Sequence, residues 1–184
     1  MSTVTGLVTF EEFDKLPDPP GGRYELHHGQ VVLMPFRKFL HAMVQDVLAD
    51  LLKPLARGKG LVMTEFPFRP EAEYEGWQAD VAFVTMERAR HAGDYLFGAP
   101  ELVVEVLSPS NTKAEILDRQ NTCLANGCIA FWTIDQKKRL VKVTGTDGKS
   151  VTYDDSRSVP LPEPLIGTLP VASIFDLPAS SKQS

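Results

Sequence analysis

The clearest periodic pattern along the chain is a stripe of apolar residues within 37–56. They recur every three to four positions, as on one face of an α-helix, and are Leu40, Met43, Val44, Val47, Leu48, Leu51, Leu52 and Leu55. A second helix is expected over about 112–126, where Gly127 supplies a C-terminal cap. A short helix at about 10–16 follows Thr9, the first residue of a capping-box pattern.

Extended segments fill most of the intervals between these helices. Residues 23–27 and 30–35 flank a two-residue loop that contains glycine, which indicates a β-hairpin. Further strand-like runs span 61–68, 77–85, 101–107, 129–135 and 140–144. This order predicts an α/β fold with a mixed β-sheet flanked by helices. The strand-helix-strand passage within 101–135 predicts two parallel strands joined by a right-handed crossover.

The length of the chain favours a single domain. A chain of 184 residues can bury one sizeable core but leaves no room for a second. We expect one domain over 1–184, with a core at about 23–144 and a proline-rich C-terminal tail at 156–184. Within that tail a last helical turn is expected at 171–175, and residues 178–184 are expected to be frayed.

Composition and charge narrow the classes of function. Lys and Arg number 19 against 24 Asp and Glu, a net charge of −5, so charge alone gives no sequence-independent grip on nucleic acid. The apolar runs fall far short of the ~20 residues that span a membrane, and the N-terminus lacks the pattern of a secretory signal. We therefore expect a cytoplasmic protein without a membrane partner.

The remaining cysteine, tryptophan and histidine residues have simple structural interpretations. Cys123 and Cys128 lack the spacing of a zinc site and are expected to be buried thiols. Trp77 and Trp132 are expected to fill the core or a subunit interface. The adjacent histidines at positions 27–28 are expected to be solvated residues of the hairpin turn.

Three acidic residues stand among apolar neighbours in separate predicted strands. Glu105 lies within Leu-Val-Val-Glu-Val-Leu, Asp80 within Ala-Asp-Val-Ala-Phe-Val, and Glu25 in the first hairpin strand. A bare buried carboxylate costs several kcal/mol, so three of them suggest convergence on a shared cation such as Mg²⁺ or Mn²⁺. The alternative is that each acid lies in water at a strand end or pairs with an arginine, and for any single acid this is favoured.

Several sequence blocks occur in the order and spacing of a known family. They are Tyr24-Glu25-Leu26-x-x-Gly29, His41 in the next helix, Ala79-Asp80-Val81, Pro100-x-Leu-Val-Val-Glu105-Val-Leu-Ser-Pro-Ser110, and Asn126-Gly127 followed by Phe131-Trp132-x-Ile-Asp135. Over about 23–135 the chain therefore resembles the Uma-two family of restriction-endonuclease-like proteins, in the PD-(D/E)XK nuclease superfamily. The resemblance implies a restriction-endonuclease-like mixed sheet and a metal-dependent endonuclease that hydrolyses DNA phosphodiester bonds.

The same resemblance implies roles for the three acids. Asp80 takes the aspartate position of the motif and Glu105 that of its second acid, and these two would hold Mg²⁺ or Mn²⁺. Glu25 would be an additional catalytic acid from the N-terminal part of the domain. A bound divalent ion lowers the pKa of a water and stabilises charge on the scissile phosphate.

The cationic residues match the family less closely. Leu107 occupies the position of the usual motif lysine and can neither orient nor activate a water. Arg119 aligns with a lysine that related sequences carry in the next helix; arginine can clamp phosphate or orient a water but accepts protons poorly. Lys113 is the other nearby cation. His41 either supports the site or contacts phosphate, or it is an ordinary partly buried histidine.

These residues leave three functional hypotheses. The first is a DNA endonuclease, for which a homodimer is expected because cutting both strands needs two active centres. The second is a nuclease-fold module that has lost its chemistry and acts in binding or regulation, an interpretation favoured by Leu107 and the acidic charge. The third is a metal-dependent hydrolase of another phosphoester, because fold resemblance does not fix the substrate.

Overall fold

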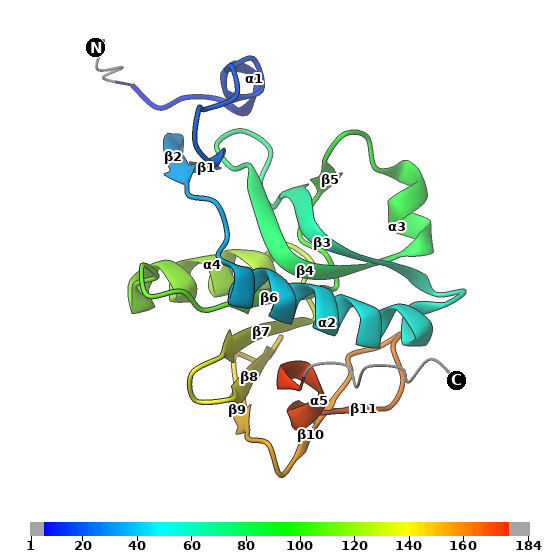
Figure 1. The fold of residues 1–184 in the computed structure, drawn as a ribbon. Coiled ribbons are helices and arrows are strands. Elements are labelled where there is room, and N and C mark those ends of the chain that lie inside the picture. The colour runs from blue at the N-terminus through cyan, green and yellow to red at the C-terminus, as the bar shows by residue number, and fades with distance from the viewer. Residues whose placement is uncertain (1–5, 177–184) are drawn as a thin grey trace, which may run out of the picture.

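The structure, a computed structural model, describes residues 6–176 and is built around a seven-stranded mixed sheet (Figure 1). The strand order is β5-β3-β4-β6-β7-β8-β9. The strands are β3 (Gly60–Arg69), β4 (Trp77–Thr85), β5 (Leu96–Phe97), β6 (Leu102–Val106), β7 (Ala130–Asp135), β8 (Leu140–Gly145) and β9 (Ser150–Tyr153). Only β5 with β3 and β6 with β7 pair in parallel, so the predicted parallel strand pair is confirmed.

Two antiparallel hairpins lie outside this sheet. They are β1 (Arg23–His27) with β2 (Gln30–Met34), and β10 (Ser158–Pro160) with β11 (Thr168–Pro170). The first hairpin forms as predicted, because Gly29 adopts a φ of 72° that glycine tolerates at a tight turn. It meets the rest of the molecule through an antiparallel bridge between Leu26 and Gly76.

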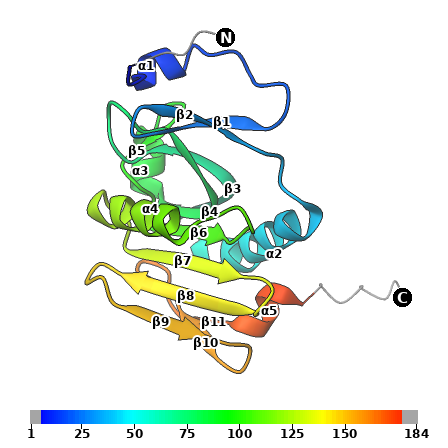
Figure 2. The ribbon, with the colours of Figure 1, turned by 90° about the vertical axis from the view of Figure 1, so that its left-hand side faces the viewer.

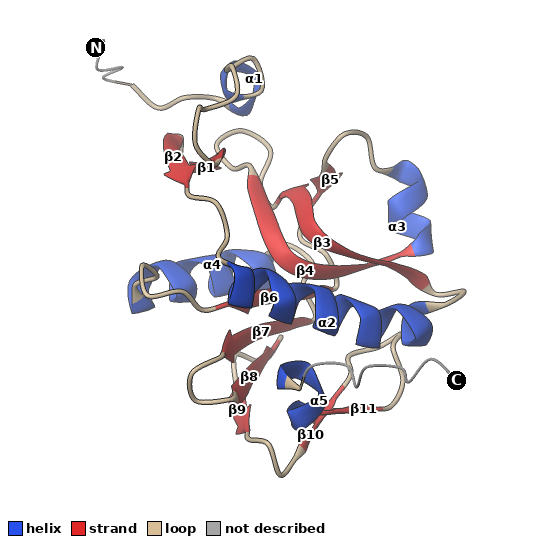
Figure 3. Ribbon diagram, viewed as in Figure 1, coloured by secondary structure: helices blue, strands red, loops and turns tan. Residues whose placement is uncertain are grey.

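Helices cover both faces of the sheet (Figures 2 and 3). The helices are α1 (Phe10–Phe13), α2 (Phe39–Ala56), α3 (Met86–His91), α4 (Lys113–Ala125) and α5 (Val171–Phe175). Side chains alternate between the two faces along β6. Val104 packs in one cluster with Leu48 of α2, whereas Val103 packs in another with Cys123 of α4. The predicted α/β architecture is confirmed.

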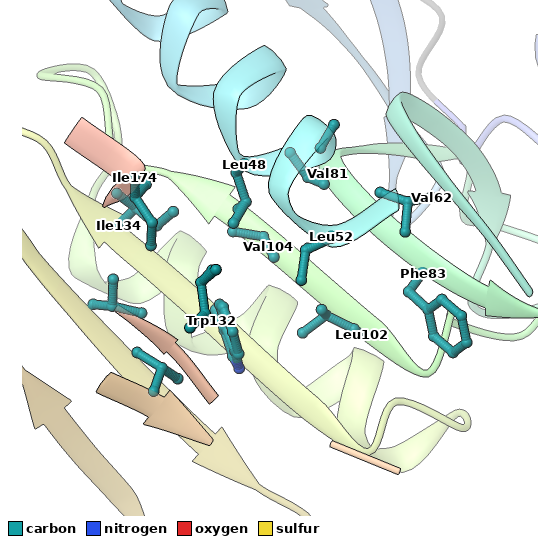
Figure 4. Packing of buried hydrophobic residues seen from close by; sticks show 14 of the residues in the cluster. Leu48, Leu52, Val62, Val81, Phe83, Leu102, Val104, Trp132, Ile134 and Ile174 are labelled. Atoms are coloured by element: carbon teal, nitrogen blue, oxygen red, sulfur yellow. The ribbon is translucent and has the colours of Figure 1, made fainter. Parts of the chain in front are cut away.

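The larger core cluster lies between the sheet and α2 (Figure 4). Leu48 and Leu52, from the apolar stripe of α2, pack in this cluster with Leu102, Val104 and Trp132. All five side chains are inaccessible to solvent. Helix α2, which the apolar periodicity predicted, therefore packs on the sheet through residues of its apolar stripe.

Strand β4 changes face at Asp80. Val81 lies in the α2-facing cluster and Ala82 in the opposite one, as alternation requires. Ala79, two positions before Val81, should share its face but belongs to the opposite cluster. On the neighbouring strand, Glu65 has a φ of 51°, which is unusual for a residue with a side chain. Asp80 therefore occupies a local twist of the β3–β4 pair.

The sequence patterns missed several short elements. Helix α3 and strands β5, β9, β10 and β11 fall in segments whose polar or proline-rich composition gave no periodic signal. The described part of the expected C-terminal tail is folded, because β10, β11 and α5 contribute buried side chains to the main core. These are Val159, Leu169, Val171 and Ile174. The last turn expected at 171–175 is confirmed, while residues 178–184 lie outside the described part.

Two further expectations concern buried groups and membranes. Cys123 and Cys128 are free and buried, and Trp77 and Trp132 lie in the core, as predicted. Among residues 6–176, no helix combines the length and the apolar character that crossing a membrane would require.

Shortening Leu48 tests the packing of α2 on the sheet. We expect Leu48→Ala to lower the free energy of unfolding by about 2–5 kcal/mol, because it leaves a cavity in a fully buried site. Urea denaturation at neutral pH measures the change. Leu117→Ala on the exposed side of α4 is the matched control and should change stability by about 0.5 kcal/mol or less. Equal losses in the two variants would contradict this assignment of the core.

Candidate functional site

The three acidic residues singled out in the sequence are brought together by strands β1, β4 and β6. The pairing of Val81 with Val104 sets the register of β4 and β6, so Asp80 and Glu105 come next at opposed positions. Glu25 reaches the same region from the β1–β2 hairpin, and the charges of Asp80 and Glu25 both act on Glu105. The three acids therefore lie in one region of the molecule, and their convergence on a shared cation stays a prediction.

Asp80 is fixed by three polar contacts. Its Oδ2 accepts a hydrogen bond of 2.7 Å from the backbone N–H of Val106, at the point where ladder pairing between β4 and β6 ends. Its Oδ1 accepts one of 2.6 Å from Gln45 Nε2 and lies 3.0 Å from Nε2 of His41. Both side chains come from α2. Of the two interpretations left open for His41, the structure supports contact with the site.

Arg119 bridges the other two acids. From α4 its Nη1 donates a hydrogen bond of 2.9 Å to Glu25 Oε2, and its Nε lies 2.9 Å from Glu105 Oε1. Its Nη2 donates to the backbone carbonyl of Gln78. All three guanidinium nitrogens therefore face protein oxygens, and the pKa of this arginine is raised, because Glu105 and Glu25 outweigh the opposing effect of burial.

Glu25 is a well-compensated buried carboxylate. Burial alone would raise its pKa, but Arg119, a hydrogen bond from His27 and the charge of Arg23 bring the pKa down to about 2. The separations to His27 Nε2 and Arg23 Nη2 are 2.9 and 3.0 Å. For this acid, pairing with arginine is the correct alternative.

Glu105 is in the opposite situation. Burial raises its pKa well above the ordinary value, Arg119 opposes this, and the negative charges of Asp80 and Glu25 raise it further. Its Oε1 is buried without a hydrogen bond, because the nearby Nε–H of Arg119 is not aligned with it. Glu105 is thus the least compensated acid of the site.

A charge count of the network gives the same result. Gln45 Nε2 also donates to Glu65 Oε1 at 2.8 Å, which joins Glu65 and its arginine partners to Asp80. The network contains four carboxyl groups and three guanidinium groups, those of Glu25, Glu65, Asp80 and Glu105 and those of Arg23, Arg37 and Arg119. One negative charge is left without a permanent positive partner.

Gln45 and Glu65 are members of the site that the sequence reading missed. For Gln45 a signal was present, since a fully buried polar residue four positions after His41 interrupts the apolar face of α2. Glu65 gave no such signal, because its role depends on the unusual backbone conformation at that position.

The structure changes the expectations for Lys113 and for the histidines of the first hairpin. Lys113 is exposed in the first turn of α4, and no ion pair joins it to the acids in the described part of the chain. His27 is not the solvated turn residue that was expected. Its ring stacks on Trp77 at a centroid distance of 5.4 Å while its Nε2 meets Glu25. His28 is largely exposed but lies 2.9 Å from Asp118 of α4.

The donor set suits a hard cation only in part. Over residues 6–176, no three His, Cys, Asp or Glu side chains form a group that could hold a metal ion. Mg²⁺ does not require three, because it commonly takes one or two carboxylates and completes its shell with waters and phosphate oxygens. Asp80 and the under-compensated Glu105 are two carboxyl groups at opposed positions of β4 and β6.

Acid titration tests the burial of Glu25. A carboxyl group whose pKa is lowered on folding stabilises the protein above its unfolded-state pKa of about 4.5 and loses that contribution as the pH falls toward about 2. Glu25→Gln should therefore reduce the free energy of unfolding at pH 7 by roughly 3 kcal/mol and flatten its decline between those pH values. Denaturation series for this variant and for the exposed control Glu71→Gln measure both effects. An unchanged acid limb would contradict the assigned pKa.

Comparisons with known proteins bear on the family and the fold of the chain. No curated protein matches the chain. The chain is similar in structure to the crystal structure of a putative nuclease belonging to DUF820 from Anabaena variabilis ATCC 29413. The TM-score is 0.79 at 19% identity, over 91% of this chain and 97% of that one. The sequence model of the Uma2 family, described as "Putative restriction endonuclease", matches residues 10–178. The chain therefore belongs to the Uma2 family, the Uma-two family that its sequence blocks resemble.

Proposed function

We propose that the protein is a metal-dependent endonuclease that hydrolyses phosphodiester bonds of DNA. The observation that carries the proposal is the placement of Asp80 and Glu105 at opposed positions of adjacent strands, in a network with more carboxyl than guanidinium groups. The description of the family supports a nuclease, and restriction endonucleases act on DNA.

Asp80 and Glu105 would hold Mg²⁺ or Mn²⁺. Carboxylate oxygens are the ligands these hard ions prefer, and a dication would compensate the charge that Arg119 leaves unbalanced. When bound, the ion supplies an activated water and stabilises charge on the scissile phosphate. It would also offset the repulsion between a chain of net charge −5 and a polyanionic substrate.

The other residues of the site position these two acids. Gln45 and His41 hold one oxygen of Asp80, and the Val106 N–H holds the other, so the carboxylate cannot rotate freely. We assign Arg119 to positioning as well, because its nitrogens are engaged by Glu25, Glu105 and a backbone carbonyl. A permanently charged guanidinium is also a poor acceptor for the proton of an attacking water.

A second candidate function follows from the absence of the motif lysine at position 107. Leu107 stands where the motif lysine would be, and Arg119 already faces Glu25, Glu105 and a backbone carbonyl. Among the described residues, no lysine forms an ion pair with the three acids. A nuclease-fold module that binds without cutting fits this feature. Metal binding and DNA cleavage, measured separately, distinguish the two functions.

Removing the carboxylate of Asp80 tests the cleavage activity. With Mg²⁺ or Mn²⁺, the purified protein should nick or linearise plasmid DNA. Asp80→Asn should slow this by about a hundredfold or more, because metal ions contribute several kcal/mol to such reactions. Asp147→Asn, the same change in the exposed turn between β8 and β9, is the matched control and should cut at the wild-type rate. Equal cleavage by Asp80→Asn would place the activity elsewhere or in a contaminant.

Calorimetric titration with Mn²⁺ tests the metal site without any DNA. The wild-type protein should bind the ion near neutral pH, whereas Asp80→Asn and Glu105→Gln should each weaken binding by at least about tenfold. Asp147→Asn should bind like the wild type. Metal binding without cleavage would favour the binding module, and absence of both would remove the metal-dependent hydrolase.

A further inference from the structure

The 32–40 segment, which runs from the end of β2 into the first turn of α2, concentrates exposed apolar side chains. Five large apolar residues of this segment face solvent: Val32, Leu33, Phe36, Phe39 and Leu40. The two aromatic rings are the most exposed, at 76% for Phe36 and 80% for Phe39. Figure 2 shows the chain between β2 and α2 at the edge of the molecule. Large apolar side chains gathered in this way are typical of an interaction surface.

Two positive charges stand between the two rings. Arg37 and Lys38 separate Phe36 from Phe39 in the sequence. Lys38 is exposed and takes part in no ion pair among residues 6–176. It stands at the N-cap of α2, where a positive charge is unfavourable to a helix, and no acidic residue of the first turn offsets it. Lys38 can therefore meet an anion from outside the chain.

The same segment is connected to Asp80 of the proposed active site. Arg37 Nη1 donates a hydrogen bond of 2.6 Å to Gln45 Oε1, and Gln45 Nε2 donates one to Asp80 Oδ1. His41, whose Nε2 lies 3.0 Å from Asp80 Oδ1, follows Lys38 by three positions, so the two lie about one helical turn apart on one face of α2. An anion held by Lys38 is therefore about one turn of α2 from a residue that positions Asp80.

Exposed rings beside cations are the features that bind single-stranded nucleic acid. Unpaired bases stack on the rings, while lysine and arginine side chains meet the phosphates. In a duplex a side chain reaches the face of a base only after the bases have been unstacked. A chain of net charge −5 also gains less from the dense phosphates of a duplex than a basic protein does. Stacking on unpaired bases is therefore the interaction that this surface fits best.

We propose that the 32–40 segment binds single-stranded DNA, with Phe36 and Phe39 stacking on unpaired bases and Lys38 contacting a phosphate. This binding deepens the proposed function and rests on it for the identity of the nucleic acid. It specifies the form of DNA that reaches Asp80 and Glu105, because the preferred substrate then has unpaired bases next to the bond that is cut. The binding itself needs neither the metal ion nor cleavage.

Fluorescence anisotropy on the full chain, with EDTA present so that nothing is cut, tests the stacking. A labelled oligothymidylate of about 12 nucleotides should bind at least about tenfold more tightly than a duplex of the same length. Phe36→Ala and Phe39→Ala should each raise the Kd for the single strand by about tenfold, because each removes a stacking platform. Phe39→Trp should keep the wild-type Kd. Ile166→Ala, which changes a side chain that is 74% exposed between β10 and β11, is the matched control and should bind like the wild type.

The salt dependence of the same binding tests Lys38. For a single strand, the slope of log Kd against log salt concentration changes by about 0.7 for each phosphate that the protein neutralises. Lys38→Gln should reduce the slope by about that amount, whereas Phe39→Ala should weaken binding without changing the slope. An unchanged slope in Lys38→Gln would overturn the assigned phosphate contact.

Cleavage measured with Mg²⁺ separates this surface from the proposed function. Single-strand binding that depends on both rings, without any cleavage, would support the surface and overturn the nuclease. Cleavage by the wild type, with Phe36→Ala and Phe39→Ala unchanged in both binding and cleavage, would overturn the surface and leave the nuclease in place. Tighter binding of the duplex, or no binding of either DNA, would also overturn the proposal and would favour a protein partner for the exposed rings.

Discussion

The site depends on one buried guanidinium group. Arg119 reaches from α4 to Glu25 of the hairpin and Glu105 of β6. Removing one partner of a buried ion pair leaves an uncompensated charge and costs several kcal/mol. The position of the first hairpin, the orientation of Glu105 and the charge balance of the site are therefore coupled through a single side chain. The pKa of Glu25 is lowered and that of Glu105 is raised, so the positive charge of Arg119 compensates the two glutamates unequally.

The elements that could be predicted were those whose apolar residues recur at a regular spacing. The apolar stripe gave α2, and the β-branched runs gave the central strands, because burial of one face imposes a regular spacing. The proline-rich C-terminal segment carried no such spacing, yet Val159 and Ile174 are fully buried. Short elements that add one or two side chains to an existing core leave no periodic pattern to detect.

The sequence identified the acidic residues of the site, but it did not identify most of the side chains that contact and compensate them. Three acids among apolar neighbours are conspicuous, since burial of a bare carboxylate is costly. Several of their partners come from α2 and α4, at distant sequence positions, so no local pattern links Gln45 to Asp80 or Arg119 to Glu25. The twist of β4 at Asp80 is a tertiary feature as well, and it is this twist that lets the carboxylate reach both α2 and the end of β6.

The separate β1–β2 hairpin gives the site an adjustable element. This hairpin is not part of the main sheet. Backbone hydrogen bonds of Leu26 with Gly76 and of Gly29 with Tyr74 attach it, together with side chains such as Glu25. If the hairpin detaches, Glu25 leaves with it and the whole positive charge of Arg119 becomes available to Glu105. Docking of this peripheral hairpin thus sets the electrical potential at Glu105, the least compensated carboxyl group of the site.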